Sequence, residues 1–313
     1  MKRWLPPLVL TALLLGACAP AVPETTTLRL GLLPILETLP LHVAQSQGYF
    51  AAEGVQVEFI PAASAAERDQ LMQAGQIDGL INDLVSTVLY NRDGVQIVIV
   101  RFARTATAED PAFRILASKD SGLTSVQDLA GVPIGLSQGT VIEYVTDRLL
   151  QAEGLAPEDI QTVAVPKIAD RMALLESGEL QAATLPDPLS SLALQAGARL
   201  ILDDTVHPEY GTSVLAFRKA VVDQSPQAIT AFLRAVEKAT AEVNADPSRW
   251  AALLSDNKLV PAPLVGTYEL PPFPPASVPT EAQYADALAW AMEKGLVTKS
   301  ASYAESVNAG FLP

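Results

Sequence analysis

The feature that most constrains the fold of this chain is an internal repeat. Residues 68–78 (RDQLMQAGQID) match residues 171–181 (RMALLESGELQ), and residues 52–55 (AEGV) match residues 152–155 (AEGL). The copies lie about 100 residues apart, which is enough chain for each to build a core of its own. The repeat therefore predicts two similar structural units.

The same order of strands and helices is expected in both copies. Strands are predicted at the apolar runs 28–33, 55–60, 79–81, 133–136, 162–165 and 182–185. Helices are predicted between them at residues 40–50, 65–74, 141–153 and 169–177. Strands that alternate with helices form parallel sheets that helices cover. We therefore expect an α/β fold of two similar lobes, each a mainly parallel sheet with helices on both faces.

Two segments, residues 101–113 and 203–212, link the repeated units. We therefore assign residues 28–106 to the first lobe and residues 107–207 to the second lobe. A chain that crosses twice between two lobes forms a hinge, and a hinge over a cleft permits closure.

Residues 208–313 are expected to return mainly to the first lobe. Helices are predicted there at residues 226–244, 247–254 and 281–294. Residues 261–279 contain the run ELPPFPP, and proline excludes both a helix and a central strand. We interpret this segment as an extended strap over the body of the protein; a binding motif for proline-recognising domains is the alternative.

Residues 1–17 have the organisation of a bacterial lipoprotein signal peptide. Lys2 and Arg3 precede an apolar run at residues 5–17, which is shorter than the roughly 20 residues that span a bilayer. The run ends in a lipobox, LGAC, so we expect Cys18 to be lipidated and residues 18–27 to form a tether. The protein is then extracytoplasmic, at the cell surface or in the periplasm. An ordinary signal peptide with a buried cysteine is the alternative.

Composition excludes several classes of function. The net charge is −14, with 35 acidic and 21 basic residues, and no basic run is present, so we expect no nucleic-acid partner. Cys18 is the single cysteine, and His42 and His207 are the two histidines. An internal disulfide, a thiolate metal site and a multi-histidine metal centre are therefore excluded, and we expect no metal.

Ligands of open α/β sheets bind beyond the carboxyl ends of the strands. These ends lie at residues 34–38, 61–64, 82–85, 137–140 and 185–188. Several polar side chains there also fit helix caps: Ser64 and Thr140 as capping boxes with Glu67 and Glu143, and Asp83 and Asp187 as N-caps. A cap that lies at a cleft can also face a ligand.

The charge balance around the expected cleft favours a neutral or partly cationic ligand with several N–H donors. The loop Ser137–Thr140 would offer backbone amides to an anion. Carboxylates at Glu143, Asp83 and Asp187 oppose this, and the nearby cations expected are Arg68, Arg101 and Arg104. We expect His42 to pack or to line the rim, and Tyr144 either to stack on a ligand ring or to pack in the core.

The chain resembles the nitrate/sulfonate/thiamine-precursor (NitT/TauT-like) group of type II periplasmic solute-binding proteins of ABC importers, in its lipoprotein form. The resemblance rests on LRLGLLP (28–34), LPLHVAQSQGYFAAEGVQVEFIP (39–61), MQAGQIDG (72–79), SGLTSVQDLAGVPIGLSQGT (121–140) and LLESGELQAATLPDP (174–188). It implies a type II periplasmic binding protein fold with the ligand between the lobes. The ligand contacts that it implies are Glu37, Thr38, Ser64, Asn82, Asp83, Gln138, Thr140, Tyr144 and Asp187.

The resemblance also implies delivery of a small molecule to the permease and ATPase subunits of an importer, without a cofactor and without chemistry on the ligand. We expect a monomer. Glu37, Asn82 and Asp83 suit a nitrogen heterocycle, such as a thiamine-precursor pyrimidine or a flavin. An alkanesulfonate or nitrate-type anion is the alternative ligand. A ligand-sensing partner of a membrane receptor and a pyrimidine synthase-like enzyme are alternative roles; such synthases use a cysteine-rich segment, and no cysteine follows Cys18.

Overall fold

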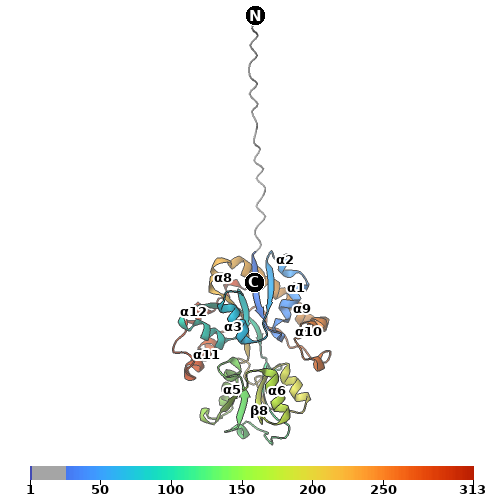
Figure 1. Cartoon of the computed structure of the whole chain (residues 1–313), viewed down its shortest axis with the longest axis vertical. Coiled ribbons are helices and arrows are strands. Elements are labelled where there is room, and N and C mark those ends of the chain that lie inside the picture. The colour runs from blue at the N-terminus through green and yellow to red at the C-terminus, as the bar shows by residue number, and fades with distance from the viewer. Residues whose placement is uncertain (2–25) are drawn as a thin grey trace.

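The computed structural model describes Met1 and residues 26–313. The expected signal peptide and Cys18 lie outside these residues, apart from Met1. The described residues form two five-stranded sheets, and each sheet is the centre of one lobe. In Figure 1 the first lobe lies above the second, and the C-terminus lies in the first lobe. None of the described helices is both long enough and apolar enough to cross a membrane.

The first lobe is built on the sheet of order β2-β1-β3-β10-β4. Its strands are β1 (Thr27–Leu32), β2 (Gln56–Pro61), β3 (Gly79–Asn82), β4 (Ile97–Thr105) and β10 (Thr212–Arg218). Its helices up to residue 90 are η1 (Leu36–Thr38), α1 (Leu39–Ser46), α2 (Tyr49–Ala52), α3 (Ala65–Gln73) and α4 (Leu84–Tyr90). The single helix expected at residues 40–50 is thus divided, because Gly48 takes a left-handed conformation (φ 71°) between α1 and α2.

The second lobe repeats this plan on the sheet of order β7-β6-β8-β5-β9. Its strands are β5 (Phe113–Ala117), β6 (Pro133–Leu136), β7 (Gln161–Ala164), β8 (Ala182–Pro186) and β9 (Arg199–Asp203). Its helices are α5 (Val141–Ala152), α6 (Ile168–Ser177) and α7 (Leu189–Gln195). Single 3-10 turns lie at Gln127–Leu129 and Pro157–Asp159 in this lobe, and at Asn91–Asp93 and Ala309–Phe311 elsewhere in the chain. The expected α/β fold of two similar lobes is confirmed.

Both sheets are mixed where the chain crosses between the lobes. In the first sheet β1 pairs parallel with β2 and β3, whereas β10 pairs antiparallel with β3 and β4. In the second sheet β6 pairs parallel with β7 and β8, whereas β5 pairs antiparallel with β8 and β9. The expected first link also starts too early, because residues 101–105 continue β4. Arg101 interrupts the apolar pattern of this strand, yet its side chain is only 1% exposed and lies inside the lobe.

The repeat extends to equivalent side-chain contacts. In the first lobe Arg68 donates from Nη1 to the carbonyl oxygen of Ile81 at 2.8 Å. In the second lobe Arg171 donates from Nη1 to the carbonyl oxygen of Thr184 at 2.6 Å, and both bonds span thirteen residues of sequence. A buried arginine therefore holds the last strand of each parallel pair to the helix that precedes it.

Residues after β10 return to the first lobe and also reach the second. They form α8 (Lys219–Gln224), α9 (Pro226–Ala245), η5 (Pro247–Trp250), α10 (Ala251–Asp256), η6 (Ala262–Leu264), α11 (Glu281–Glu293) and α12 (Tyr303–Ser306). Outside the short turn η6, the proline-rich residues 261–279 form neither helix nor strand, as the sequence predicts. Figure 1 shows α9 and α10 on one side of the first lobe and α11 on the other.

Candidate functional site

A cavity of about 340 Å³ lies where the two lobes meet. Its wall combines three parts of the chain: the first crossing segment with the strand ends that flank it, Asp187 together with helix α7, and the strap. The lining residues are Arg104, Glu109, Asp110, Pro111, Arg114, Asp187, Ser191, Gln195, Leu264, Thr267, Tyr268, Glu269 and Pro271. Because both lobes contribute to its wall, its shape depends on how the lobes are arranged.

Asp187 is the centre of the polar network in this cavity. Its Oδ1 accepts hydrogen bonds from Arg114 Nη1 at 2.5 Å, Ser191 Oγ at 2.5 Å and Ser190 Oγ at 3.1 Å. Its Oδ2 accepts a hydrogen bond from the Tyr268 hydroxyl. Burial alone would raise the pKa of Asp187, but the Arg114 charge and the hydroxyl donors hold it below its ordinary value. The carboxylate is therefore charged and stabilised from several sides.

The expected N-cap role of Asp187 is wrong. Helix α7 begins at Leu189, its N-cap is Pro188, and no side chain among the described residues caps it. The Asp187–Pro188 peptide bond is cis. The carboxylate contacts Arg114 on β5 instead, because a fully charged guanidinium is a stronger partner for it than a backbone amide.

Arg104 connects the first loop of the first lobe to Asp187. Its side chain is 2% exposed, and it donates to the carbonyl oxygens of Asp187 at 3.3 Å and Pro111 at 3.0 Å. Its Nη1 lies 3.9 Å from Glu37 Oε1, and its Nη2 lies 3.8 Å from Asp187 Oδ2. Of the expected ligand contacts, Glu37 and Asp187 are thus brought together by one buried arginine.

Two expected contacts lie at the end of β3. The side chain of Asn82 is buried; its Nδ2 donates to Thr87 Oγ1 at 3.2 Å, and its Oδ1 has no hydrogen-bond partner among the described residues. Asp83 caps α4 by accepting from the backbone amide of Ser86 at 2.8 Å, as expected. Burial raises the pKa of Asp83, although this amide and the Arg68 charge oppose the change. The end of β3 therefore carries one unpaired acceptor, Asn82 Oδ1, and one carboxyl group, that of Asp83, which caps α4.

Ser64 and Thr140 also cap their helices, but the expected capping boxes are incomplete. The Glu67 and Glu143 carboxylates accept from the amides of Ala63 and Gly139, which precede the N-caps. Ser64 accepts from the amide of Glu67 at the start of α3, and Thr140 accepts from the amide of Ile142 at the start of α5. Glu143 accepts from the amide of Gly139 at 2.6 Å. Gln138 is exposed and donates to Thr162 Oγ1 at 3.0 Å. The Ser137–Thr140 loop therefore uses one of its amides on a carboxylate of the chain itself.

Two of the expected ligand contacts, Thr38 and Tyr144, are buried and hydrogen-bond within the protein. Thr38 is completely buried, and its hydroxyl donates to the carbonyl oxygen of Ile35 at 2.7 Å. Tyr144 is 2% exposed, donates to Asp286 Oδ2 at 2.8 Å, and meets the Trp290 ring edge-on at 5.6 Å between centroids. This is the core-packing arrangement for Tyr144, between α5 and α11.

Arg101 was expected near the cleft, and that placement is wrong. Its guanidinium contacts Glu237 at 2.9 Å and the carbonyl oxygen of Pro274 at 2.7 Å, so it joins α9 to the strap. His42 packs edge-on against Phe59 with ring centroids 5.2 Å apart, and burial lowers its pKa. Its packing role is as expected.

Sequence reasoning missed Arg114 and Tyr268. Arg114 had a signal, because it is the charged residue of the apolar strand FRILA. Tyr268 lies in a segment without periodicity and 81 residues from Asp187, so no local pattern places it. Within residues 26–313, no cluster of three or more His, Cys, Asp or Glu side chains could hold a metal ion.

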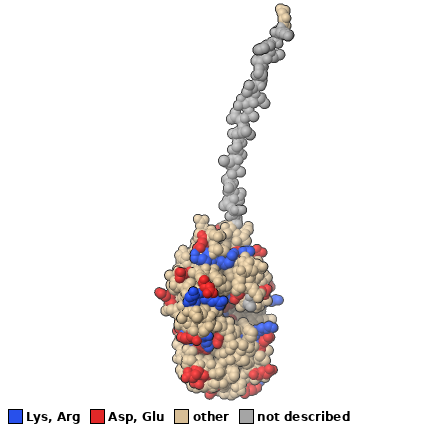
Figure 2. All heavy atoms as spheres, turned by 60° about the vertical axis from the view of Figure 1, so that its left-hand side comes forward, with Lys and Arg blue, Asp and Glu red and all other residues tan. Residues whose placement is uncertain are grey.

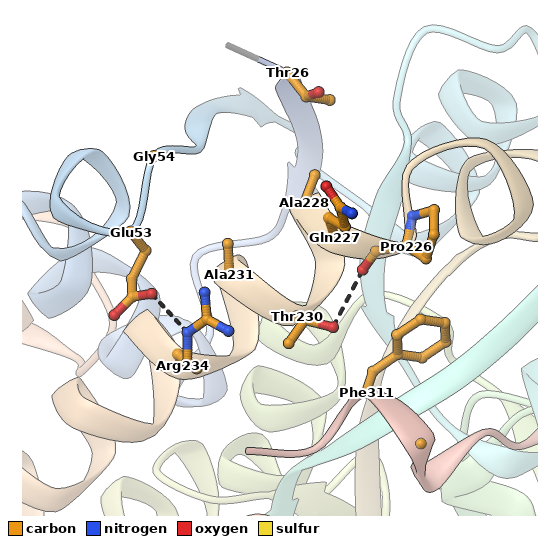
Figure 3. A pocket seen from close by; sticks show the side chains of 11 residues that line it. Thr26, Glu53, Gly54, Pro226, Gln227, Ala228, Thr230, Ala231, Arg234 and Phe311 are labelled. Carbon is orange, nitrogen blue, oxygen red and sulfur yellow. Dashed lines mark hydrogen bonds and ion pairs between the residues drawn. The ribbon is translucent and has the colours of Figure 1, made fainter. Parts of the chain in front are cut away.

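A larger hollow of about 720 Å³ lies on the first lobe, away from the junction (Figure 3). It is bordered by Thr26, the start of α9 and Phe311, and the ion pair between Glu53 and Arg234, at 2.6 Å, lies at one side of it. It contains none of the expected ligand contacts and receives no residue from the second lobe. The cavity at Asp187 is therefore the candidate site.

Comparisons with known proteins agree with the fold and identify the family. The family model described as NMT1/THI5 like matches residues 36–250. The crystal structure of the periplasmic aliphatic sulphonate binding protein SsuA from Escherichia coli superposes with a TM-score of 0.76 at 22% identity, covering 90% of this chain and 92% of that one. This similarity shows a shared fold.

Relatives by sequence have two kinds of name. A "Putative thiamine biosynthesis protein" of Haemophilus influenzae is 28% identical over 68% of this chain and 67% of its own length. The "4-amino-5-hydroxymethyl-2-methylpyrimidine phosphate synthase THI11" of Saccharomyces cerevisiae is 24% identical over 67% of this chain, and the match spans 64% of the yeast protein. The resemblance to the NitT/TauT-like group is confirmed, and the chain belongs to the NMT1/THI5-like family.

Proposed function

We propose that this chain is the extracytoplasmic solute-binding protein of an ABC importer, anchored by lipid at Cys18. The observation that carries the proposal is the Asp187 cavity, whose wall comes from both lobes and from the segment that crosses between them. Its volume of about 340 Å³ falls in the range of about 300–1,000 Å³ that small-molecule sites occupy. A ligand that contacts both lobes favours the closed arrangement, which the permease then recognises.

We propose a nitrogen heterocycle with N–H donors, such as a thiamine-precursor pyrimidine or a flavin, as the ligand. Among the described residues that line the cavity, the acidic side chains of Glu109, Asp110, Asp187 and Glu269 outnumber the arginines Arg104 and Arg114. Both arginines contact Asp187, and Arg104 also lies 3.9 Å from Glu37, so two carboxylates face the two guanidinium groups. The Haemophilus relative's name, which refers to thiamine biosynthesis, supports the same ligand class.

An alkanesulfonate or a similar anion is the second candidate. Two arginines line the cavity, and the buried Nε of Arg104 has no hydrogen-bond partner among the described residues. Arginine recognises planar and tetrahedral oxyanions through paired N–H groups. The name of the structural relative SsuA agrees with this ligand class.

The synthase-like enzyme is a less favoured candidate for this chain, although the yeast relatives carry that name. Cys18, in the expected lipobox, is the single cysteine of the sequence, so a cysteine-rich segment of the synthase type has no counterpart here. A ligand-sensing protein that binds a membrane receptor when its ligand is bound would use the same cavity. Co-purification with a permease, rather than with a receptor, distinguishes importer from sensor.

A thermal-shift panel tests the ligand class. The protein, refolded to remove endogenous ligand, is heated with 4-amino-5-hydroxymethyl-2-methylpyrimidine, riboflavin, an alkanesulfonate, nitrate and bicarbonate in turn. A ligand at 100 times its Kd adds about 2.7 kcal/mol to the free energy of unfolding, which is readily measured. A shift with a heterocycle supports the proposal. A shift with the sulfonate or nitrate alone overturns the heterocycle and favours the second candidate.

A further inference from the structure

The strap, which the sequence predicts to lie extended over the body of the protein, forms one wall of the cavity. Leu264 and Phe273 are each 2% exposed and lie in the apolar core of the first lobe. Between them Val265, Gly266, Thr267 and Glu269 are exposed, and Gly266 takes a left-handed conformation with φ of 86°. Residues 265–271, called here the lid, are thus a partly exposed loop that is fixed at both ends, and its Tyr268 and Leu270 pack against the core of the first lobe.

The far end of the lid is held firmly. Asn244 on α9 exchanges two hydrogen bonds with the backbone of Phe273, both 2.8 Å long. Arg101 donates to the carbonyl oxygen of Pro274 at 2.7 Å. These bonds tie Phe273 and Pro274 to α9 and to the buried Arg101 of the first lobe, so the strap beyond the lid moves with that lobe.

The middle of the lid crosses to the second lobe through Tyr268. Its hydroxyl donates to Oδ2 of Asp187, while Leu192 on α7 packs against the same apolar cluster that contains Leu264. Burial and the Asp187 charge raise the pKa of the Tyr268 phenol, so it remains a proton donor throughout the neutral range. The bond therefore connects a loop carried by one lobe to a carboxylate carried by the other.

The opposite side of the junction is built differently. One apolar cluster continues from Leu80 in the first lobe through Trp290 on α11 to Val145 in the second lobe. Trp290 Nε1 also donates to Asp147 Oδ2 at 2.8 Å, and Lys294 Nζ lies 2.8 Å from the same oxygen. Separating the lobes here would expose a packed apolar core that both lobes share. Separating them at Tyr268 would widen an existing cavity and release the contacts of Arg104 with Asp187.

We propose that residues 265–271 are a lid on the cavity, that the Tyr268–Asp187 hydrogen bond is its latch, and that the lobes open at this latch while the α5–α11 contact stays closed. The Tyr268 hydroxyl occupies the Asp187 oxygen that a ligand N–H group would use, so ligand entry and latch release compete. The proposal takes the Asp187 cavity as the ligand site from the proposed function. Its test needs no ligand, so the two can fail independently.

Hydrogen exchange of the full chain tests the latch. The amides of Val265, Thr267 and Tyr268 donate to carbonyl oxygens within the strap, so their exchange reports opening of the lid. In Tyr268→Phe we expect these amides to exchange at least about 10-fold faster, as loss of a hydrogen bond to a charged group implies. Amides of α5 and α11 are expected to keep their wild-type rates.

Tyr303→Phe is the matched control, because the Tyr303 hydroxyl donates to Pro279 O at 2.8 Å inside the C-terminal segment and crosses to no other lobe. It should leave lid exchange unchanged. If Tyr268→Phe does not fold, Asp187→Asn is the second variant, because it weakens the acceptor of the same hydrogen bond. It must then increase the exchange rates of the lid amides. Unchanged lid exchange in the variant, or equal acceleration of the lid and of α5, overturns the proposal.

Discussion

Arg68 and Arg171 hold equivalent positions in the two lobes, and each packs against a glycine of the first parallel strand. A Cβ atom added to Gly31 would lie 3.4 Å from Arg68 Cγ, and one added to Gly135 would lie 3.5 Å from Arg171 Cγ. Each arginine then donates to the strand that follows its helix. The repeat in the sequence therefore reflects a buried arginine that is built into both lobes.

Arg171→Met is expected to destabilise the protein strongly. The Arg171 side chain is completely buried and donates to Val165 O, Thr184 O and Ser137 Oγ, and burial lowers its pKa to about 10. Removing it leaves buried acceptors unsatisfied, at a cost of about 3 kcal/mol in the free energy of unfolding. Urea denaturation measures this, with the exposed Arg92→Met as the control. A change below about 0.5 kcal/mol in Arg171→Met would refute the structural role.

Gly135→Ala is expected to lower the free energy of unfolding by about 1–3 kcal/mol, because adding atoms to a well-packed core destabilises a protein by this amount. The added Cβ would lie 2.5 Å from Leu180 Cδ1, a contact that no folded protein accommodates without movement. Leu180→Ala alone should also destabilise, but the double variant should recover part of the loss from Gly135→Ala. Chemical denaturation of the four proteins in this cycle measures the coupling. Purely additive losses would mean that Leu180 is not the group that excludes a side chain at this position.

The crossing segments contain a carboxyl group that makes stability depend on pH. Asp204 is completely buried, and its Oδ1 accepts from the amides of Ala112 at 2.9 Å and Phe113 at 3.2 Å. Burial raises the pKa of Asp204 to about 7, although these amides and the Arg104 charge oppose the change. The folded pKa exceeds the unfolded value, so the protonated form stabilises the fold. That contribution is complete below about pH 4 and is lost as the pH rises through 7.

Asp204→Asn should remove this dependence, since the amide keeps an acceptor for the two backbone donors. The difference in free energy of unfolding between Asp204→Asn and wild type should increase in favour of the variant between pH 4 and pH 8, by up to about 4 kcal/mol. Denaturation series at several pH values give this difference. A difference that stays constant with pH would show that Asp204 titrates as an ordinary carboxyl group.

Lys294→Met is expected to weaken the α5–α11 contact. Lys294 contacts Glu143 at 3.1 Å and Asp147 at 2.8 Å, and both carboxylates are buried. Without the Lys294 ammonium, the two carboxylates repel each other with no cation beside them, which lowers the free energy of unfolding by about 2–3 kcal/mol. The loss is smaller than for a fully buried ion pair, because the Lys294 side chain is 35% exposed and solvent screens its charge. The exposed Lys299→Met is the control. Equal melting temperatures for the two variants would contradict a role for Lys294 at this contact.

Charged side chains are unevenly distributed over the face drawn in Figure 2. The lower end of the second lobe shows carboxylates, whereas basic side chains gather nearer the junction and on the first lobe.

Local sequence patterns placed most elements of the fold, because caps and apolar periodicity act over a few residues. Thr140 fixed the start of α5, and residues 133–136 are β6 as predicted. The site was harder to predict, because its partners are distant in sequence. Asp187 is bonded by Arg114 from a neighbouring strand and by Tyr268 from the strap, and these long-range contacts overrode the helix-cap role that its local sequence favoured.

Titration calorimetry of 4-amino-5-hydroxymethyl-2-methylpyrimidine tests the central claim that a solute binds in the cavity at Asp187. The ligand is titrated into wild type, into Asp187→Asn, and into Glu53→Gln, which alters the other hollow. We expect one site per chain in the wild type, a Kd at least about 10-fold higher in Asp187→Asn, and an unchanged Kd in Glu53→Gln. Equal affinity in wild type and Asp187→Asn, or a loss of binding confined to Glu53→Gln, would contradict the account.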